Sequence, residues 1–178
     1  SKVVVGYKGP ALGDADHVTV SVLIEVLLGG RTSRVPPRKI RTHTLENDAR
    51  GSVGPHRDPS LIEVFASARD EHTSEELLAV IDEEIEHVRR EPVLQEEIER
   101  AVARAELGLL SGLETADGKA STIGFYETVL RRPNAAFERL SAMKYVEPGD
   151  LLRVARRYLT QAERTVVFVR PQKEAVSA

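Results

Sequence analysis

The sequence predicts an α+β fold, in which a mainly antiparallel β-sheet is covered by helices, and it places residues 1–178 in a single domain. Strand-like segments lie at both ends and in the middle of the chain, and the two middle segments are close enough to form a hairpin. Amphipathic helical patterns fill the stretches between them. Dispersed strands that include a hairpin favour antiparallel pairing over the regular strand–helix alternation of parallel sheets. At 178 residues the chain can bury one substantial core.

The composition argues against several classes of protein. The net charge of −3 gives no overall basic field, so we expect no nucleic-acid partner. Cysteine is absent, which excludes disulfide frameworks and thiolate metal sites. No apolar run approaches the roughly 20 residues that span a bilayer, so we expect no transmembrane segment. The chain starts with Ser1 shortly before a strand, and we expect it to be a fragment of a longer protein or a non-catalytic subunit.

In the first half of the chain, strands flank a long helix and a segment interrupted by prolines. Asp14 suits a helix N-terminus and Gly29 suits a helix end. Pro36 and Pro37 cannot lie inside a helix, so only a short helix is expected after them. The expected elements are a strand over 3–8, a helix over 14–29, a short helix over 38–45, and a hairpin of strands over roughly 50–56 and 61–69.

The second half reads as mostly helical. Thr73 and Glu76 have the spacing of a capping box, and Pro92 ends the helix that follows. The inward stripe of that helix is expected to be Leu77, Ile81, Ile85 and Val88. The next, longer helix is expected to bury Leu94, Ile98, Ala101, Val102, Ala105, Leu109 and Leu113. Further helices are expected near 117–131, 134–142 and 150–159, before a closing strand over 164–171.

Two histidine patterns have a spacing that metal chemistry could use. His72 opens a string close to the H-x-x-E-H motif, but its fifth position is Glu76, and a helix cap explains the string. Glu83, His87 and Glu91 share one helix face, which we expect to point to water, without the sheltering surroundings that metal sites use. We therefore expect no metal ligand and no zinc in this chain. No serine lies in a G-x-S-x-G elbow either.

A basic cluster lies between the first helix and the hairpin. It is formed by Arg31, Arg34, Arg38, Lys39 and Arg41, followed by His43 and Arg50. Arginine and lysine at this density could bind carboxylates or backbone carbonyls of an extended peptide. An exposed, charged turn without a ligand is the alternative interpretation.

Five segments in order resemble the second half of the pitrilysin-type zinc peptidases, a family that includes the mitochondrial processing peptidase and the respiratory core proteins. They are residues 4–10, 27–34, 58–69, 96–101 and the closing helix and strand over 150–171. The resemblance implies two similar α+β halves that close around a peptide, of which only the first half carries zinc and the general base. This chain resembles the inactive second half. Bacterial members of the family are often periplasmic or associated with the cell envelope, so the resemblance implies such a location here.

The resemblance also implies an arginine and a tyrosine that hold substrate. The tyrosine position falls just after Ala49, where this chain has Arg50, and the arginine position lies near His43 or Arg41. The candidate substrate-binding residues are therefore Arg41, His43 and Arg50. We expect a non-catalytic half that binds an extended peptide beside a catalytic half-domain or subunit, with a homodimer as a further possibility. The alternative is a structural or assembly module of the same fold that handles no peptide.

Overall fold

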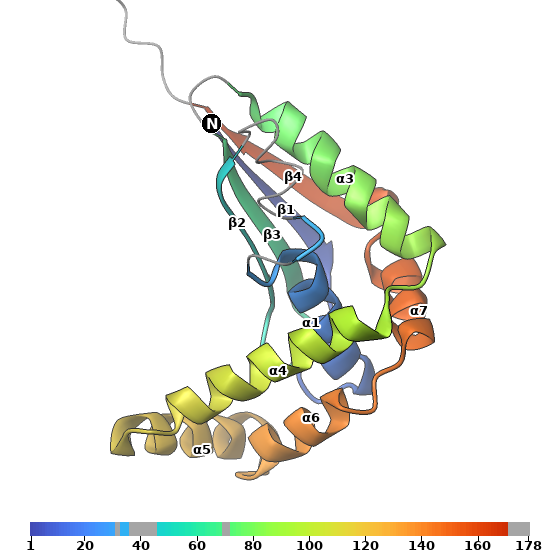
Figure 1. Ribbon diagram of the computed structural model, residues 1–178. Coiled ribbons are helices and arrows are strands. Elements are labelled where there is room, and N and C mark those ends of the chain that lie inside the picture. Colours follow the sequence, from blue (N-terminus) through green and yellow to red (C-terminus); the bar gives the residue numbers. More distant parts are fainter. Residues whose placement is uncertain (31–32, 36–45, 69–71, 171–178) are drawn as a thin grey trace, which may run out of the picture.

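The computed structural model describes residues 1–30, 33–35, 46–68 and 72–170, with the side chains of β2 described from Ala49 onward. The α+β class predicted from the sequence is confirmed (Figure 1). The elements are, in chain order, β1 (Lys2–Lys8), α1 (Ala15–Leu28), β2 (Glu46–Val53), β3 (Leu61–Ala68), α3 (Ser74–Arg90), α4 (Gln95–Gly112), α5 (Ala116–Leu130), α6 (Ala135–Met143), α7 (Pro148–Tyr158), a 3₁₀ turn (Gln161–Glu163) and β4 (Arg164–Val169). None of the described helices is both long and apolar enough to cross a lipid bilayer.

The four described strands form one antiparallel sheet in the order β2-β3-β1-β4. The predicted hairpin is confirmed as β2 and β3, although β2 begins and ends earlier than the expected 50–56. β1 lies between the hairpin and β4, so Val5 pairs with Val64 on one side and with Val166 on the other. The first and last strands of the chain therefore lie side by side.

Helices cover one face of this sheet. The inward residues of β1 and β3 alternate with exposed or half-buried ones, as expected for a sheet with one covered face. α1 supplies much of the core against that face, with nine buried residues, and α3 packs beside it on β1 and β3. Gly51 of β2 lets α1 pack closely, because a Cβ at this position would lie 2.5 Å from Leu28 Cδ1 and 2.7 Å from Ile24 Cγ2.

The predicted N-terminus and inward stripe of α3 are confirmed. The Thr73 hydroxyl accepts from the Glu76 amide at 3.2 Å, and the Glu76 carboxylate accepts from the Thr73 amide at 3.1 Å. The stripe residues Leu77, Ile81, Ile85 and Val88 are all buried. Arg164 of β4 forms a two-point ion pair with Asp82 of α3, which fixes the edge strand to the helix layer.

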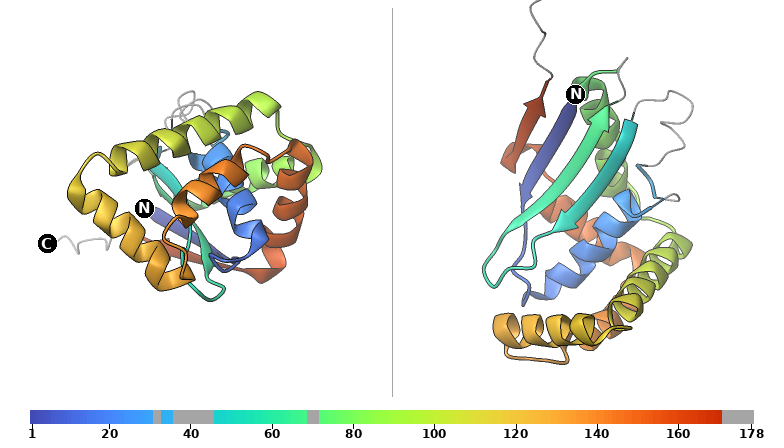
Figure 2. Two further views of the ribbon diagram at one scale, coloured as in Figure 1. Left: turned by 90° about the horizontal axis from the view of Figure 1, so that it is seen from below. Right: turned by 90° about the vertical axis from the view of Figure 1, so that its left-hand side faces the viewer.

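The stripe expected along α4 is wrong at both ends. Ile98, Ala101 and Val102 are buried, but Leu94 is 66% exposed, and α4 buries no residue after Val102. The reason is that α4 leaves the body of the domain and turns into α5, which has no buried residue at all (Figures 1 and 2). We refer to residues 106–130, the end of α4 together with α5, as the helical arm.

Candidate functional site

The described helices leave one face of the sheet uncovered (Figure 2, right). On this face lies a hollow of about 390 Å³. It is lined by Val4 of β1, by Arg50 and Ser52 of β2, and by Glu63 and Phe65 of β3. These residues are cross-strand neighbours, because the register pairs Phe65 with both Arg50 and Val4, and Glu63 with Ser52. The hollow therefore combines an apolar floor with one basic, one acidic and one hydroxyl group.

Arg50 lies over Phe65 in this hollow. Its guanidinium carbon is 4.4 Å from the centre of the Phe65 ring, the geometry of a cation–π contact. Arg50 points outward because the next residue, Gly51, faces α1, and successive strand residues alternate between faces. A stacked guanidinium keeps a planar fork of N–H donors, which suits carboxylates and backbone carbonyls.

Within the described part of the chain, the sheet ends in one strand at each edge. β2 forms one edge and β4 the other. β4 carries exposed Val167, Phe168 and Val169 and has no charged residue between Thr165 and Val169, so it lacks the charges that usually protect an edge. An extended peptide could pair with such an edge through main-chain hydrogen bonds. The sequence alone did not indicate which strands were edges.

The predicted substrate-binding residues are only partly described. Arg41 and His43 lie outside the described residues, as does the short helix expected over 38–45. Arg50 lies on the uncovered face. Arg34, from the same basic cluster, instead forms a bidentate ion pair with Glu97 at the start of α4, with both distances 2.7 Å. Arg34 therefore stabilises the fold, and its guanidinium is directed at Glu97 instead of at a ligand.

Sequence reasoning missed the other residues of the hollow. Val4, Ser52, Glu63 and Phe65 were each placed on strands but not linked to Arg50. The signal that connects them is strand alternation, since residues of one parity share a face. Using it requires the register between β1, β2 and β3, and the sequence did not provide it.

The two histidines of these patterns each contact a glutamate four residues further along the chain, at one end of α3. His72 Nδ1 lies 3.1 Å from Glu76 Oε2 at the start of α3, as part of the cap. His87 Nε2 lies 3.2 Å from Glu91 Oε2 on the exposed end of α3. Among the described residues, no group of three or more His, Cys, Asp or Glu side chains could hold a metal ion. The donor set that zinc needs is thus not found in this part of the chain.

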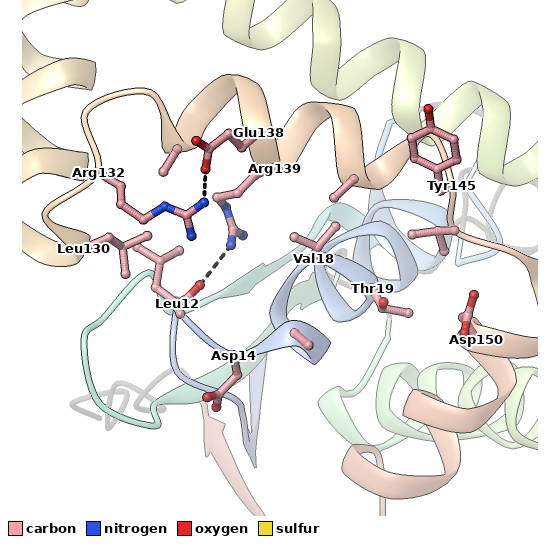
Figure 3. Close-up of a pocket in the computed structure, with 15 residues that line it drawn as sticks. Leu12, Asp14, Val18, Thr19, Leu130, Arg132, Glu138, Arg139, Tyr145 and Asp150 are labelled. Atoms are coloured by element: carbon pink, nitrogen blue, oxygen red, sulfur yellow. Dashed lines mark hydrogen bonds and ion pairs between the residues drawn. The ribbon is translucent and has the colours of Figure 1, made fainter.

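A larger hollow, of about 440 Å³, lies between the start of α1 and α6 (Figure 3). Its charged groups already have partners within the chain. Arg132 is ion-paired with Glu138, the Asp14 carboxylate accepts from the Ala11 amide, and the Asp150 carboxylate accepts from the Glu147 amide. We therefore interpret this hollow as a seam between packed elements and place the candidate site on the sheet.

Arg139 beside this seam is bound to a buried histidine. It donates to the Leu12 carbonyl at 2.9 Å and to His17 Nδ1 at 2.7 Å. Because a guanidinium can only donate, Nδ1 must accept, and His17 Nε2 then donates to the Gly54 carbonyl at 3.2 Å. Burial and the nearby Arg139 charge lower the pKa of His17, so the imidazole is held neutral. His17 therefore connects α1, α6 and the hairpin loop.

Residues 1–105 match the family model described as the peptidase M16 inactive domain. The chain belongs to this family. It is 23% identical over 169 residues to the zinc protease PqqE of Helicobacter pylori, and 26% identical over 154 residues to an uncharacterized zinc protease of Streptomyces coelicolor. These matches cover 95% and 86% of this chain but only 38% and 33% of the two relatives. The chain thus spans about a third of the length of these curated relatives.

Solved structures share the fold over nearly the whole length of this chain. A protease from Helicobacter pylori superimposes with a TM-score of 0.86 at 22% identity, covering 96% of this chain and 41% of that one. A peptidase M16 inactive domain from Pseudomonas fluorescens gives 0.74 at 18%, covering 96% and 42%. A chain in complex III2 from Candida albicans gives 0.81 at 11%, covering 93% and 41%. The resemblance stated from the sequence is therefore confirmed.

Proposed function

We propose that this M16 inactive domain is the non-catalytic half of a zinc metallopeptidase, which binds an extended peptide and forms one wall of the cleavage chamber. Zinc and the activated water would come from a separate catalytic half-domain or subunit. The observation that supports this most directly is the uncovered sheet face, where Arg50 and Phe65 line a hollow between β1, β2 and β3. An apolar floor with a few polar groups is the usual character of a binding site.

The hollow suits one residue of an extended peptide. Val4 and Phe65 offer apolar surface, while the Arg50 guanidinium can bind a substrate carboxylate or carbonyl. Glu63 of the same hollow provides a carboxylate for a basic or amide group. Backbone pairing at a sheet edge would add affinity with little demand on sequence.

A structural or assembly role is the second candidate. The observation that favours it is the arginine at position 50, where the resemblance implies a substrate-holding tyrosine. The same fold also occurs in a chain of complex III2 from Candida albicans. In this role, substitution at the hollow would leave peptide cleavage unchanged.

Reconstitution with the catalytic half separates the two candidates. The test mixes this chain with the H-x-x-E-H-containing half, which is encoded either in the same gene or in an adjacent one. Cleavage of a fluorogenic, unstructured peptide is then measured with and without a chelator. We expect no cleavage by this chain alone, restored cleavage by the mixture, and a KM increase of about tenfold for Arg50→Ala. Unchanged kinetics for Arg50→Ala would favour the assembly role, and chelator-sensitive cleavage by this chain alone would refute both.

A further inference from the structure

The helical arm exposes apolar side chains that nothing in the described structure covers. Leu107 and Leu110 of α4 are 65% and 53% exposed, and Ile123 of α5 is 48% exposed. α5 buries none of its 15 residues. Isolated helices of this length are marginal in water, and helices in proteins are usually stabilised by packing of an apolar face. The arm therefore has the character of a surface that becomes buried in a larger assembly.

The glycines of the arm support the same interpretation. A Cβ at Gly108 or Gly124, inside α4 and α5, would meet no atom within 4 Å. Glycine weakens a helix interior, so packing within this chain does not account for these two residues. Gly118 differs, since a Cβ there would lie 1.8 Å from the Gly112 carbonyl oxygen in the turn between the helices. Close approach of another molecule would account for small residues at positions 108 and 124.

The direction of the arm indicates where a partner would lie. The arm projects from the body on the same side as the uncovered sheet face, so that the sheet and the arm form the two limbs of an L (Figures 1 and 2). A body placed against the arm would also face the hollow at Arg50. The arm also lies beyond residue 105, where the match to the family model ends.

We propose that the helical arm is the surface on which the zinc-carrying half-domain docks. This inference rests on the proposed function and adds the location of the contact. The relatives argue for this occupant over a second copy of this chain, because more than half of the length of PqqE, and of the solved Helicobacter pylori protease chain, lies outside the matched part. Each of them thus carries a further portion larger than this domain, and α5 of the arm buries none of its own residues.

The test compares substitutions at leucines that are all more than half exposed. Leu107→Glu with Leu110→Glu places charges on the arm, while Leu94→Glu changes a leucine of matching exposure about 20 Å away along α4. Isothermal titration calorimetry with the H-x-x-E-H-containing half as titrant measures the Kd. We expect the double variant to bind at least tenfold more weakly and Leu94→Glu to remain within about twofold. Gly108→Leu is an independent variant that fills open space and should also weaken binding.

The outcomes separate this inference from the proposed function. Binding by the unmodified chain that survives both arm variants would overturn the docking surface and leave the proposed function standing. Lack of binding by the unmodified chain would overturn the proposed function and the docking surface together. Sedimentation of the chain alone should show a monomer. A dimer that the double variant abolishes would assign the arm to a second copy and overturn the inference. Circular dichroism must show native helix content for each variant.

Discussion

Replacement of Glu97 by glutamine tests how the start of α4 is fixed to the body of the domain. The Glu97 carboxylate accepts two hydrogen bonds from Arg34 at 2.7 Å and one from the Leu94 amide at 2.8 Å. The Arg34 and Glu97 side chains are only 15% and 13% exposed. Glu97→Gln would leave a largely buried guanidinium facing a neutral amide, one of whose N–H groups points at another donor. This pair joins the chain after α1 to the helix that carries the arm.

The expected cost follows from the burial of the pair. Breaking a fully buried ion pair from one side costs about 3–5 kcal/mol. The Arg34 guanidinium is still partly exposed, and the carboxylates of Glu84 and Glu91 also stabilise its charge. We therefore expect the free energy of unfolding to fall by about 2–4 kcal/mol at pH 7. Urea denaturation monitored by circular dichroism measures this difference. Glu96→Gln is the matched control, because the Glu96 side chain is 81% exposed and its carboxylate lies as far as 3.8 Å from Arg100. This substitution should lower the free energy of unfolding by less than about 0.5 kcal/mol.

The pH dependence gives the sharper check. Burial alone would raise the pKa of Glu97, but the hydrogen bonds from Arg34 and the Leu94 amide outweigh it, and the pKa lies below its ordinary value of 4.5. A carboxyl group with a lowered folded-state pKa stabilises fully above its unfolded pKa and loses this contribution as the pH falls through the folded value. The gap between wild type and Glu97→Gln should therefore narrow below about pH 4.5. A gap under about 0.5 kcal/mol at pH 7, or one that does not change down to pH 3, would refute this reasoning.

Two further predictions concern the seam and the arm. His17 has a lowered pKa, so the wild type should lose stability as the pH falls below 6.5. The urea midpoint of His17→Gln should depend less on pH between pH 7.5 and 5.5. His56→Gln, a change at an exposed histidine, should keep the pH dependence of the wild type. An equal slope in His17→Gln would contradict a neutral, buried imidazole. Gly108→Ala should stabilise the isolated chain by about 0.5–1 kcal/mol, seen as a thermal midpoint roughly 1–4 °C higher, whereas Gly118→Ala should lower it. A lower midpoint for Gly108→Ala would show that position 108 is not open space.

The parts of the fold that local chemistry determines could be predicted from the sequence. The capping box at Thr73, the buried stripe of α3 and the antiparallel hairpin each depend on residues close together in the chain. The stripe of α4 failed for a physical reason. Helical periodicity identifies an apolar face, but it does not say whether the same chain covers that face. Leu94 belongs to the predicted stripe but is exposed, and Leu109 and Leu113 at its other end are only half-buried.

The candidate site could be predicted only in part, because it depends on strand register. Arg50 was identified from its position in the resemblance, while Phe65 and Val4 join it through pairing across three strands. A small error in the bounds of β2 changes which residues are opposite each other. The His17–Arg139 contact is beyond sequence reasoning for a similar reason, since it joins residues 122 positions apart. Such contacts follow from the assembled fold and leave no local pattern.

The sheet hollow and the helical arm should affect activity in different ways if one catalytic half faces both. Charges at Leu107 and Leu110 would weaken assembly, so the lost cleavage should return when the catalytic half is supplied in large excess. Arg50→Ala acts on bound peptide, and its higher KM should persist at any concentration of the partner. A titration of the partner against both variants therefore separates the two roles in one experiment. If excess partner rescued Arg50→Ala as well, Arg50 would belong to the interface between the halves, and the hollow would not be the peptide site.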